Sequence, residues 1–344
     1  FTTTKNDIAD IPTTAKKAGQ TLEVSATVTY TKGTEAIPVE TQVDVVVLPK
    51  VEPKGVTVLK DSTGLDEAVK AKAVEAATAV PTDKLPDGVT VRVKEVKAGT
   101  VPATTTTGEQ TPATAVVEYV KDGKVVATRE VTVPVTVVGS TAKKLVVFEG
   151  DTVTKDDVKG AVTPGTDGTK GEPVIADDIT AKAGNKEATI PVTYDNGKLT
   201  ETVKVPVTVL PKPTPKGIIV AKDSDKEKAK EKALAKAKEA IADGTFKGKL
   251  PANVTNVSID ENVDNPATSD DTDVNVTVKY TVGGEEKTTV VKVPVTVVEG
   301  VPQIVPVDEN NKQPNPENSI DKTEYPDDST FEYDPKTPVN TTTP

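Results

Sequence analysis

Carboxylates are the residues in this sequence best suited to chemistry, because histidine and cysteine are both absent. Ser–His–Asp and Cys–His catalysis, and metal sites built on imidazole or thiolate, need those two residue types. A pair of carboxylates acting as acid and base is the catalytic arrangement that remains. No such pair stands out from the spacing, so we predict a non-enzymatic protein with no catalytic, cofactor-binding or metal-binding residues.

The densest acidic group lies between positions 260 and 273. Calcium takes carboxylate oxygens as ligands, which makes this group a candidate calcium site. Its spacing departs from the D-x-[DN]-x-[DN]-G pattern of calcium loops, and charge runs of this kind are usually solvated. We therefore expect a solvated acidic loop. Its members are Asp260, Glu261, Asp264, Asp270, Asp271 and Asp273.

Three further polar groups have simpler interpretations. Asp308-Glu-Asn-Asn311 lies among prolines and is expected to be a linker or loop. Asp151 and Asp156-Asp157 have the character of turn and helix-start residues. The lysine-rich run from 226 to 241 lacks the interleaved aromatic residues on which nucleic acids stack, so we expect a solvated helix face with Glu–Lys support. Its lysines are Lys226, Lys228, Lys230, Lys232, Lys236 and Lys238.

Charge and composition narrow the class of protein. The 344 residues carry a formal net charge of −11, which opposes binding to nucleic acids and to anionic membrane surfaces. No apolar run approaches the roughly 20 residues that cross a bilayer. The sequence starts without a signal peptide or an initiator methionine, so we expect a piece of a longer protein. Abundant valine and threonine with only 3% aromatic residues favour strands and several small cores.

One pattern occurs four times: a strand containing a tyrosine, then a turn, then a second strand striped with valine. Asp-Gly, Asn-Gly and Gly-Gly between alternating apolar runs are strong hairpin signals, because these residues adopt positive φ at low cost. We therefore predict four β-hairpins, at residues 26–48, 115–138, 190–210 and 274–298.

Three of the hairpins carry a proline inside the second strand, and Asp44 holds that position in the first. Proline has no amide proton to donate, so this strand is expected at a sheet edge, or the proline marks a bulge. The prolines are Pro134, Pro206 and Pro294.

The four hairpin tyrosines could stack on a ligand or pack in a core. A position that recurs in a recurring hairpin is more simply a packing position, and strands favour aromatic residues at half-buried sites. We therefore expect packing. The tyrosines are Tyr30, Tyr119, Tyr194 and Tyr280.

The intervals between the four hairpins alternate long, short and long, which predicts the organisation of the chain. We expect a long repeat at 51–138, a short repeat at 139–210 and a long repeat at 211–298. Residues 1–50 are expected to be the C-terminal part of a truncated short repeat, and 299–344 the N-terminal part of a further repeat or a linker. Short connections, which we call the joins (48–53, 138–142 and 210–215), favour semi-rigid spacing where they are rich in proline.

Each long repeat also contains a run with helical periodicity. Asp61-Ser62 and Asp223-Ser224 precede these runs and are expected to cap the helices, with Gly244 as a stop. The apolar positions are Leu65, Val69, Ala73, Ala76 and Val80 in the first run and Leu234, Ala237 and Ile241 in the second. The predicted fold is mainly β: tandem immunoglobulin-like β-sandwich repeats in an elongated array, with one short helix inserted in each long repeat.

The short repeat resembles a known family. Val192-Thr-Tyr194-Asp-Asn-Gly197, followed by Val203-Lys-Val-Pro206-Val-Thr-Val209, is similar to the closing hairpin of the Rib/alpha-like (Rib and long-Rib) repeat family of Gram-positive surface proteins. The tail from Ile320 to Pro344, with Tyr325-Pro326-Asp327 and Phe331-Glu-Tyr333, resembles the opening half of such a repeat. The resemblance covers most of the chain, less closely in the long repeats. The usual Tyr-Pro-Asp-Gly of the hairpin is replaced here by Tyr-Asp-Asn-Gly.

This resemblance implies small immunoglobulin-like domains in tandem between a distal adhesive region and a cell-wall-anchored end. We therefore expect extracellular, non-enzymatic stalk or spacer repeats of a cell-surface adhesin, projecting a distal binding domain as a monomeric rod. The expected partners are the neighbouring repeats and, through the parent protein, a host surface ligand. No cofactor, nucleic acid or membrane span is expected in this segment. The alternative is that the repeats themselves bind a host glycan or protein.

Overall fold

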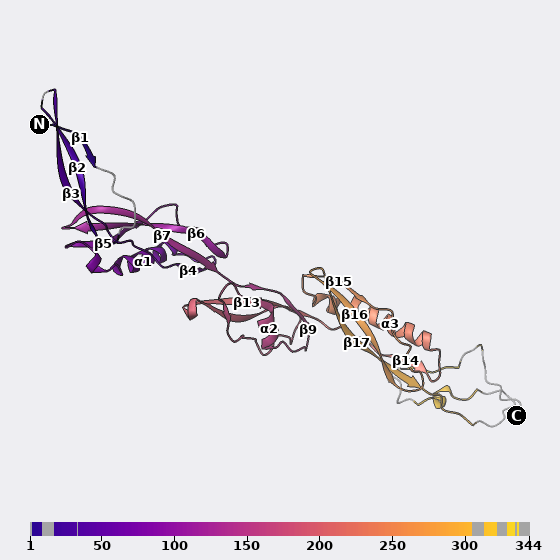
Figure 1. Cartoon of the computed structure of the whole chain (residues 1–344). Coiled ribbons are helices and arrows are strands. Elements are labelled where there is room, and N and C mark those ends of the chain that lie inside the picture. The colour runs from indigo at the N-terminus through magenta and orange to yellow at the C-terminus, as the bar shows by residue number, and fades with distance from the viewer. Residues whose placement is uncertain are drawn as a thin grey trace. The chain divides into compact units, whose positions relative to one another are not determined.

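The computed structural model describes residues 2–8, 17–32, 34–304, 313–321, 329–333 and 336. Among them the protein is mainly β, as predicted, and several separate sheets carry most of its regular structure (Figure 1). The chain forms two compact units. The first comprises Phe1–Thr141, Val162–Glu172 and Pro191–Val203, and the second Ala142–Ala161, Pro173–Ile190 and Lys204–Pro344.

Each of the four predicted hairpins lies in a sheet of its own. The first sheet is antiparallel with the order β1-β2-β3, and its strands are β1 (Thr2–Ile8), β2 (Thr21–Lys32) and β3 (Glu35–Val46). The turns of the second and fourth hairpins have positive φ at both central residues, 51° and 76° at Asp122 and Gly123 and 61° and 90° at Gly283 and Gly284. These values are those that the Asp-Gly and Gly-Gly signals predict.

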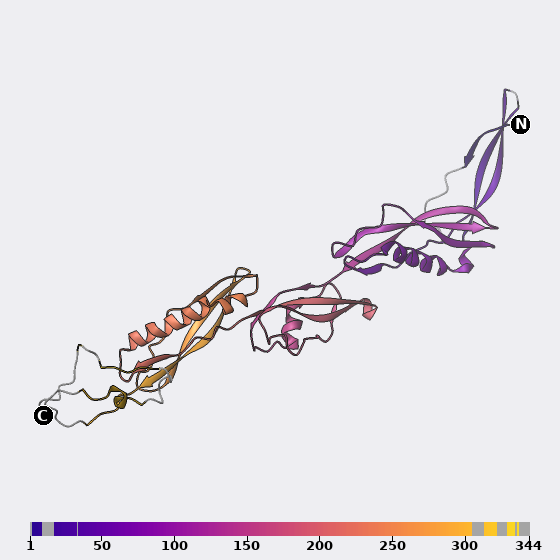
Figure 2. The ribbon, with the colours of Figure 1, turned by 180° about the vertical axis from the view of Figure 1, so that it is seen from behind.

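Residues 51–138 form a four-stranded sheet with the order β4-β7-β6-β5. Its strands β5, β6 and β7 are antiparallel, and the short β4 joins β7 in parallel. Helix α1 covers one face of this sheet (Figures 1 and 2). The elements are β4 (Val56–Leu59), α1 (Leu65–Thr78), the 3-10 turn η1 (Thr82–Lys84), β5 (Val89–Val96), β6 (Gly108–Lys121) and β7 (Lys124–Val138).

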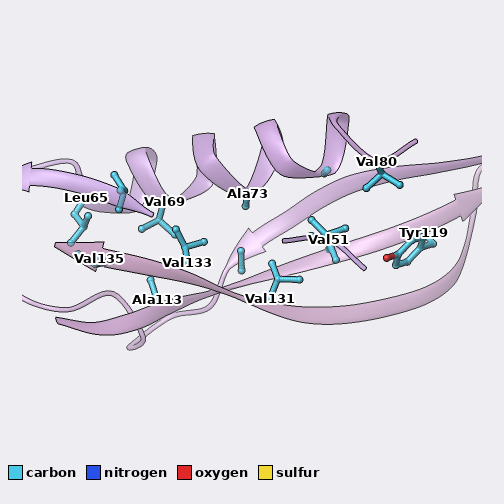
Figure 3. Close-up of a cluster of buried hydrophobic side chains, with 14 of the residues drawn as sticks. Val51, Leu65, Val69, Ala73, Val80, Ala113, Tyr119, Val131, Val133 and Val135 are labelled. Carbon is cyan, nitrogen blue, oxygen red and sulfur yellow. The ribbon is translucent and has the colours of Figure 1, made fainter. Parts of the chain in front are cut away.

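The core of 51–138 lies between this sheet and α1. Valines alternate along β7, and Val131, Val133, Val135 and Val137 are buried while the residues between them stay more exposed. The buried side chains of α1 point at the sheet, with Val69 facing Val133 (Figure 3). Each fully buried valine contributes about 1.5 kcal/mol or more. A helix thus supplies the second layer here, and the predicted sandwich geometry stays a prediction.

Residues 211–298 repeat this architecture in the order β14-β17-β16-β15, with β14 parallel to β17 and α3 in the place of α1. The two segments also share loop hydrogen bonds. The Asp61 amide donates to the Thr104 carbonyl at 2.9 Å, and the Asp223 amide to the Thr268 carbonyl at 2.9 Å. The elements are β14 (Ile218–Ala221), α3 (Lys226–Ala242), α4 (Gly244–Gly248), β15 (Val254–Ile259), β16 (Thr272–Val282) and β17 (Glu285–Val298).

The helices occur where predicted, but their ends differ. The N-cap of α1 is Gly64, at φ 79°, and that of α3 is Asp225, whose side chain accepts from the Glu227 amide. The predicted caps were wrong because Asp61 and Asp223 adopt positive φ in a tight turn before each helix. The fully buried positions of α1 are Leu65, Val69, Ala73 and Ala77, which repeat every four residues. The predicted Ala76 packs against the same core but is only partly buried.

Helix α3 stops just before Gly244, as predicted, but a second short helix follows. Helix α3 ends at Ala242, and Asp243 turns the chain into the short helix α4, which begins at Gly244. The Asp243 carboxylate caps α4 by accepting from the amides of Thr245 and Phe246 at 2.8 and 3.1 Å. A side-chain cap therefore decides this boundary, where the sequence reading relied on glycine.

Residues 139–210 contain a four-stranded sheet with the order β11-β12-β13-β9 and a two-stranded sheet β10-β8. Strand β9 pairs with β13 in parallel. Asp156 and Asp157 lie in the first turn of α2, as predicted. The elements are β8 (Thr141–Ala142), β9 (Leu145–Phe148), α2 (Lys155–Ala161), β10 (Val162–Thr163), β11 (Thr169–Lys170), β12 (Gly184–Tyr194), the 3-10 turn η2 (Asp195–Gly197) and β13 (Leu199–Leu210).

The remaining described residues form a 3-10 turn η3 (Pro316–Ser319) and a bridge between Gly300 and Ile320. Most of the tail that resembles an opening half-repeat, including Tyr325-Pro326-Asp327, lies outside the described residues, as does Asp308–Asn311. The repeat boundaries stay predictions.

The sequence predicted that the prolines of the closing strands lie on edge strands or mark bulges. The edge prediction was wrong. Strands β7, β13 and β17 each have neighbours on both sides. Each proline instead lies one residue before the point at which the short parallel strand joins, so up to that point one side of the strand is open. The register also shifts opposite Pro134, whereas Pro294 pairs with Asp273 without a shift.

We predict that Val278→Ala, at a position with 0% exposure, lowers the free energy of unfolding of residues 211–298 by about 2 kcal/mol through lost burial and a residual cavity. The matched control is Val290→Ala on β17, where the side chain is 57% exposed and the change should be near zero. Hydrogen exchange read by mass spectrometry measures the local loss of protection. Equal losses in the two variants would contradict the placement of this core.

Candidate functional site: buried tyrosines at the joins

Three of the four hairpin tyrosines are buried, which confirms the packing prediction for them. The exposed fractions are 2% for Tyr119, 1% for Tyr194 and 0% for Tyr280. Tyr30 differs, because it is 38% exposed on the face of the β2–β3 hairpin. The tyrosine position is therefore a packing position in residues 51–138, 139–210 and 211–298, and a partly exposed one on the β2–β3 hairpin.

Each buried hydroxyl reaches the join that precedes its own segment. Tyr119 donates to the carbonyl of Pro49, and Tyr280 donates to the carbonyl of Pro211 at 2.6 Å. In the short segment, the Tyr194 hydroxyl lies 2.6 Å from the Ser140 hydroxyl. These contacts were not predicted from the sequence. One signal was present in the two long segments, where Tyr119 and Tyr280 follow the prolines of their joins by 70 and 69 residues.

The tyrosine bonds solve a problem of buried polar groups. Pro49 and Pro211 are buried, and their carbonyls need a donor. A phenol in a core also needs a partner for its hydroxyl. Each group satisfies the other, so the start of each long segment is held against its closing hairpin.

The join before residues 211–298 is packed by aromatic rings as well. The Tyr280 ring meets Phe148 edge-on, with centroids 5.3 Å apart and planes at 66°, and Phe246 of α4 lies 6.5 Å away. Lys212 lies over the Phe148 ring at 5.9 Å and pairs with Asp151 at 2.9 Å. Side chains from both sides of the join thus restrain it.

At the join 138–142, hydrogen bonds between side chains take the place of the aromatic packing. Glu201 accepts from the Ser140 amide at 2.9 Å and from the Tyr194 hydroxyl at 3.2 Å. The Gly165 amide donates to the Tyr194 hydroxyl at 3.4 Å. Tyr194 therefore links three parts of the first compact unit around the join.

Burial raises the pKa of all three phenols above the ordinary tyrosine value. The shift is largest for Tyr280, the most deeply buried of them. A raised phenol pKa means that the neutral, hydrogen-bonding form is the one the fold holds. Tyr119 and Tyr280 donate from this neutral form, and Tyr194 both donates to Glu201 and accepts from Gly165.

The acidic group at 260–273 is not assembled into a metal site in the part of the chain that the structure describes, where no cluster of three potential ligands occurs. Most of its members have cationic or amide partners instead. The Lys279 ammonium, hydrogen-bonded to Asp260 at 2.8 Å, lowers the pKa of that carboxyl. Glu261 pairs with Lys238 at 2.6 Å, Asp273 pairs with Lys292 at 3.0 Å, and Asp271 accepts from the Val297 amide at 2.6 Å.

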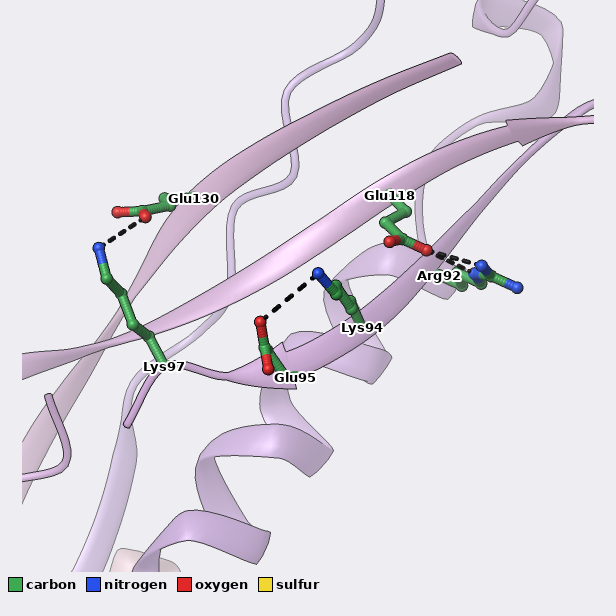
Figure 4. Close-up of polar contacts among 6 residues, drawn as sticks. All are labelled: Arg92, Lys94, Glu95, Lys97, Glu118 and Glu130. Carbon is green, nitrogen blue, oxygen red and sulfur yellow. Dashed lines mark hydrogen bonds and ion pairs between the residues drawn. The ribbon is translucent and has the colours of Figure 1, made fainter. Parts of the chain in front are cut away.

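Charged side chains on the outer faces of the sheets pair across strands. On the face of β5–β6–β7 opposite α1, Glu118 accepts from Nε and Nη2 of Arg92 at 2.9 and 2.7 Å (Figure 4). Lys97 pairs with Glu130 at 2.7 Å on the same face. On α3 the lysine run includes a Lys236–Glu239 pair at 2.7 Å. The Lys97–Glu130 and Lys236–Glu239 pairs are largely exposed and add little stability. Glu118 is only 7% exposed, so its bonds to Arg92 satisfy a nearly buried carboxylate.

Two surface features could contact a ligand. One is an apolar face on the β2–β3 hairpin, where the exposed fractions are 38% for Tyr30, 38% for Ile37 and 45% for Val39. The other is a cleft of about 400 Å³ beside the join at 210–215, whose lining includes Lys216, Lys249 and Phe246.

No family model and no curated protein matches this sequence. Among solved structures, it is similar to the sialic acid binding region of a Streptococcus sanguinis SK1 adhesin, with 13% identity, 88% of this chain and 86% of that chain covered, and a TM-score of 0.18. It is similar to Drosophila N-cadherin EC1-4, with 10% identity, 82% and 84% covered, and a TM-score of 0.17. TM-scores this low give the likenesses no weight. Among the described residues, no helix has the length and apolarity to cross a membrane.

We predict that Tyr280→Phe lowers the free energy of unfolding of residues 211–298 by about 1–3 kcal/mol, because the buried Pro211 carbonyl loses its donor. Tyr30→Phe is the matched control, and its exposed hydroxyl should cost less than about 0.5 kcal/mol. Urea unfolding followed by segment-resolved hydrogen exchange gives both values. A Tyr280→Phe effect as small as that of the control would show that the bond does not hold the join.

We also predict that stability falls at alkaline pH through these phenols. An unfolded tyrosine ionises near pH 10, whereas the folded pKa of Tyr280 is higher. The tyrosine contribution is therefore fully present below about pH 10 and is lost as the pH rises towards the folded pKa. Between neutral and strongly alkaline pH, the melting temperature should fall less steeply for Tyr280→Phe than for the parent chain. Both proteins carry the same lysines, so lysine deprotonation affects them equally. Parallel curves would contradict the buried, neutral phenol.

Proposed function

We propose that this chain is a set of tandem, immunoglobulin-like spacer repeats of the Rib/alpha-like (Rib and long-Rib) type. In this proposal they belong to an extracellular, cell-wall-anchored adhesin of a Gram-positive bacterium. The repeats act without catalysis and project a distal binding domain away from the cell surface. Each repeat contacts its neighbours in the chain, and the parent protein binds the host ligand.

The observation that carries this proposal is the shared architecture of 51–138 and 211–298. They have the same strand order, the same loop hydrogen bonds and a buried tyrosine bonded to the preceding proline. A fold that recurs with its join held in the same way suits a protein whose reach depends on the number of repeats. Ion pairs between strands lie on the outer faces of both sheets.

The alternative is that the repeats bind a host glycan or protein. The exposed face around Tyr30 and Ile37 is the observation that favours it, because apolar patches on soluble proteins often mark contact sites. Glycan arrays and host-protein pull-downs with the parent chain and Tyr30→Ala separate the two functions. Binding that the substitution removes would favour the alternative.

We predict that small-angle X-ray scattering of the whole chain gives a maximum dimension on the order of 100 Å or more. This value follows if the repeats of the proposed spacer are arranged end to end and each has the length of its strands, which rise about 3.3 Å per residue. A compact globule of this length would have a radius of gyration of only about 20 Å. Removal of residues 139–210 should shorten the maximum dimension by about the length of one repeat. A radius of gyration near the globular value, together with a maximum dimension that the deletion does not shorten, would reject the spacer.

A further inference from the structure

In three successive segments, a four-residue strand near the start pairs in parallel with the closing strand. β4 pairs with β7, β9 with β13 and β14 with β17. Each pairing comprises four consecutive residue pairs. These run from Val56–Val135 to Leu59–Val138, from Leu145–Val207 to Phe148–Leu210, and from Ile218–Val295 to Ala221–Val298.

A further backbone bond closes each parallel pair at the same place. The amide that follows the short parallel strand donates to the carbonyl of the last residue of the closing strand. The distances are 2.7 Å from Lys60 to Val138, 2.8 Å from Glu149 to Leu210, and 2.9 Å from Lys222 to Val298. The accepting residues are 0–9% exposed, so water competes poorly for these bonds.

The parallel direction matters when the chain is pulled. Tension draws the short parallel strand towards its N-terminus and the closing strand towards its C-terminus. Because the two strands are parallel, these pulls act in opposite directions along a common axis, and the hydrogen bonds between them are loaded together. In an antiparallel hairpin pulled at its open end, the bonds break one after another.

We infer that the pairs β4·β7, β9·β13 and β14·β17 are mechanical clamps that let the chain bear tension along its length. This inference deepens the proposed spacer function, on which it rests, by assigning the spacer a load. Forced unfolding depends on the rate of crossing an unfolding barrier, so the direction of pulling can raise resistance without raising equilibrium stability.

The joins continue the line of load between clamps. Val138 ends one clamp, and two residues later Ser140 is held by Tyr194. Leu210 ends the next clamp, and Pro211 directly after it is held by Tyr280. Tension therefore passes from each of these clamps into a join that is fixed to the following closing hairpin.

Single-molecule pulling on the whole chain tests the clamps, and the absence of native cysteine allows anchors to be placed at chosen sites. The pair Lys216→Cys and Glu299→Cys loads β14·β17 in shear. The pair Asp270→Cys and Glu299→Cys opens the β16–β17 hairpin from its free end. All three positions are exposed. We expect a several-fold higher rupture force in the first geometry, with roughly 3.5 Å released per residue between the anchors. Equal forces would overturn the clamp.

Lys222→Pro provides a second test, because it removes the amide that donates to Val298. We expect it to lower the rupture force for the 216/299 anchors while leaving the force for the 270/299 anchors nearly unchanged. The second geometry is the matched control for a general loss of stability. An equal fall in both geometries would overturn the clamp.

The outcome is separable from that of the scattering experiment. A high shear force in a chain with globular dimensions would retain the clamp and reject the spacer. Equal rupture forces in an extended chain would reject the clamp alone.

Discussion

The structure depends on one constraint: a buried phenol and a buried join carbonyl must satisfy each other. The bond from Tyr280 to Pro211, and its counterpart from Tyr119 to Pro49, join residues about 70 positions apart. Without its partner, each group would be a costly unpaired polar atom in an apolar core. The bond therefore fixes the entry of the chain to the closing hairpin in each long segment.

The valine stripe explains how so few aromatic residues suffice for these cores. Alternation along β7 and β17 gives each sheet one apolar face, and the small residues of α1 and α3 let a helix approach it closely. Ala229, Ala233 and Ala237 line the buried side of α3, while its lysines face outward or pair with carboxylates. The composition is thus matched to thin two-layer cores.

The hairpins, their glycine turns and the two helices were predictable because each rests on residues close in sequence. The positive φ at Asp122 and Gly123, and the burial of Tyr119, follow from local alternation and turn chemistry. The helix caps could not be predicted in this way. Asp61 and Asp223 lie in turns that hydrogen bonds to Thr104 and Thr268, about 40 residues away, hold in place.

The tyrosine–join bonds and the short parallel strands were also beyond the sequence analysis. Strands such as β4 and β14 are four residues long and carry too little periodicity to reveal a partner at the far end of the segment. Proline at position 134 or 294 predicted an edge strand or a bulge, but the point at which the parallel strand joins is set by tertiary packing.

The central claim is that each closing hairpin seals a core belonging to its own segment. The most direct measurement is the NMR amide spectrum of residues 211–298 expressed alone, compared with the same residues in the whole chain. Independent cores predict that the two spectra overlay, apart from residues that lose the contacts of Val146, Phe148 and Leu210 with this core. A collapsed spectrum typical of an unfolded chain would contradict the claim.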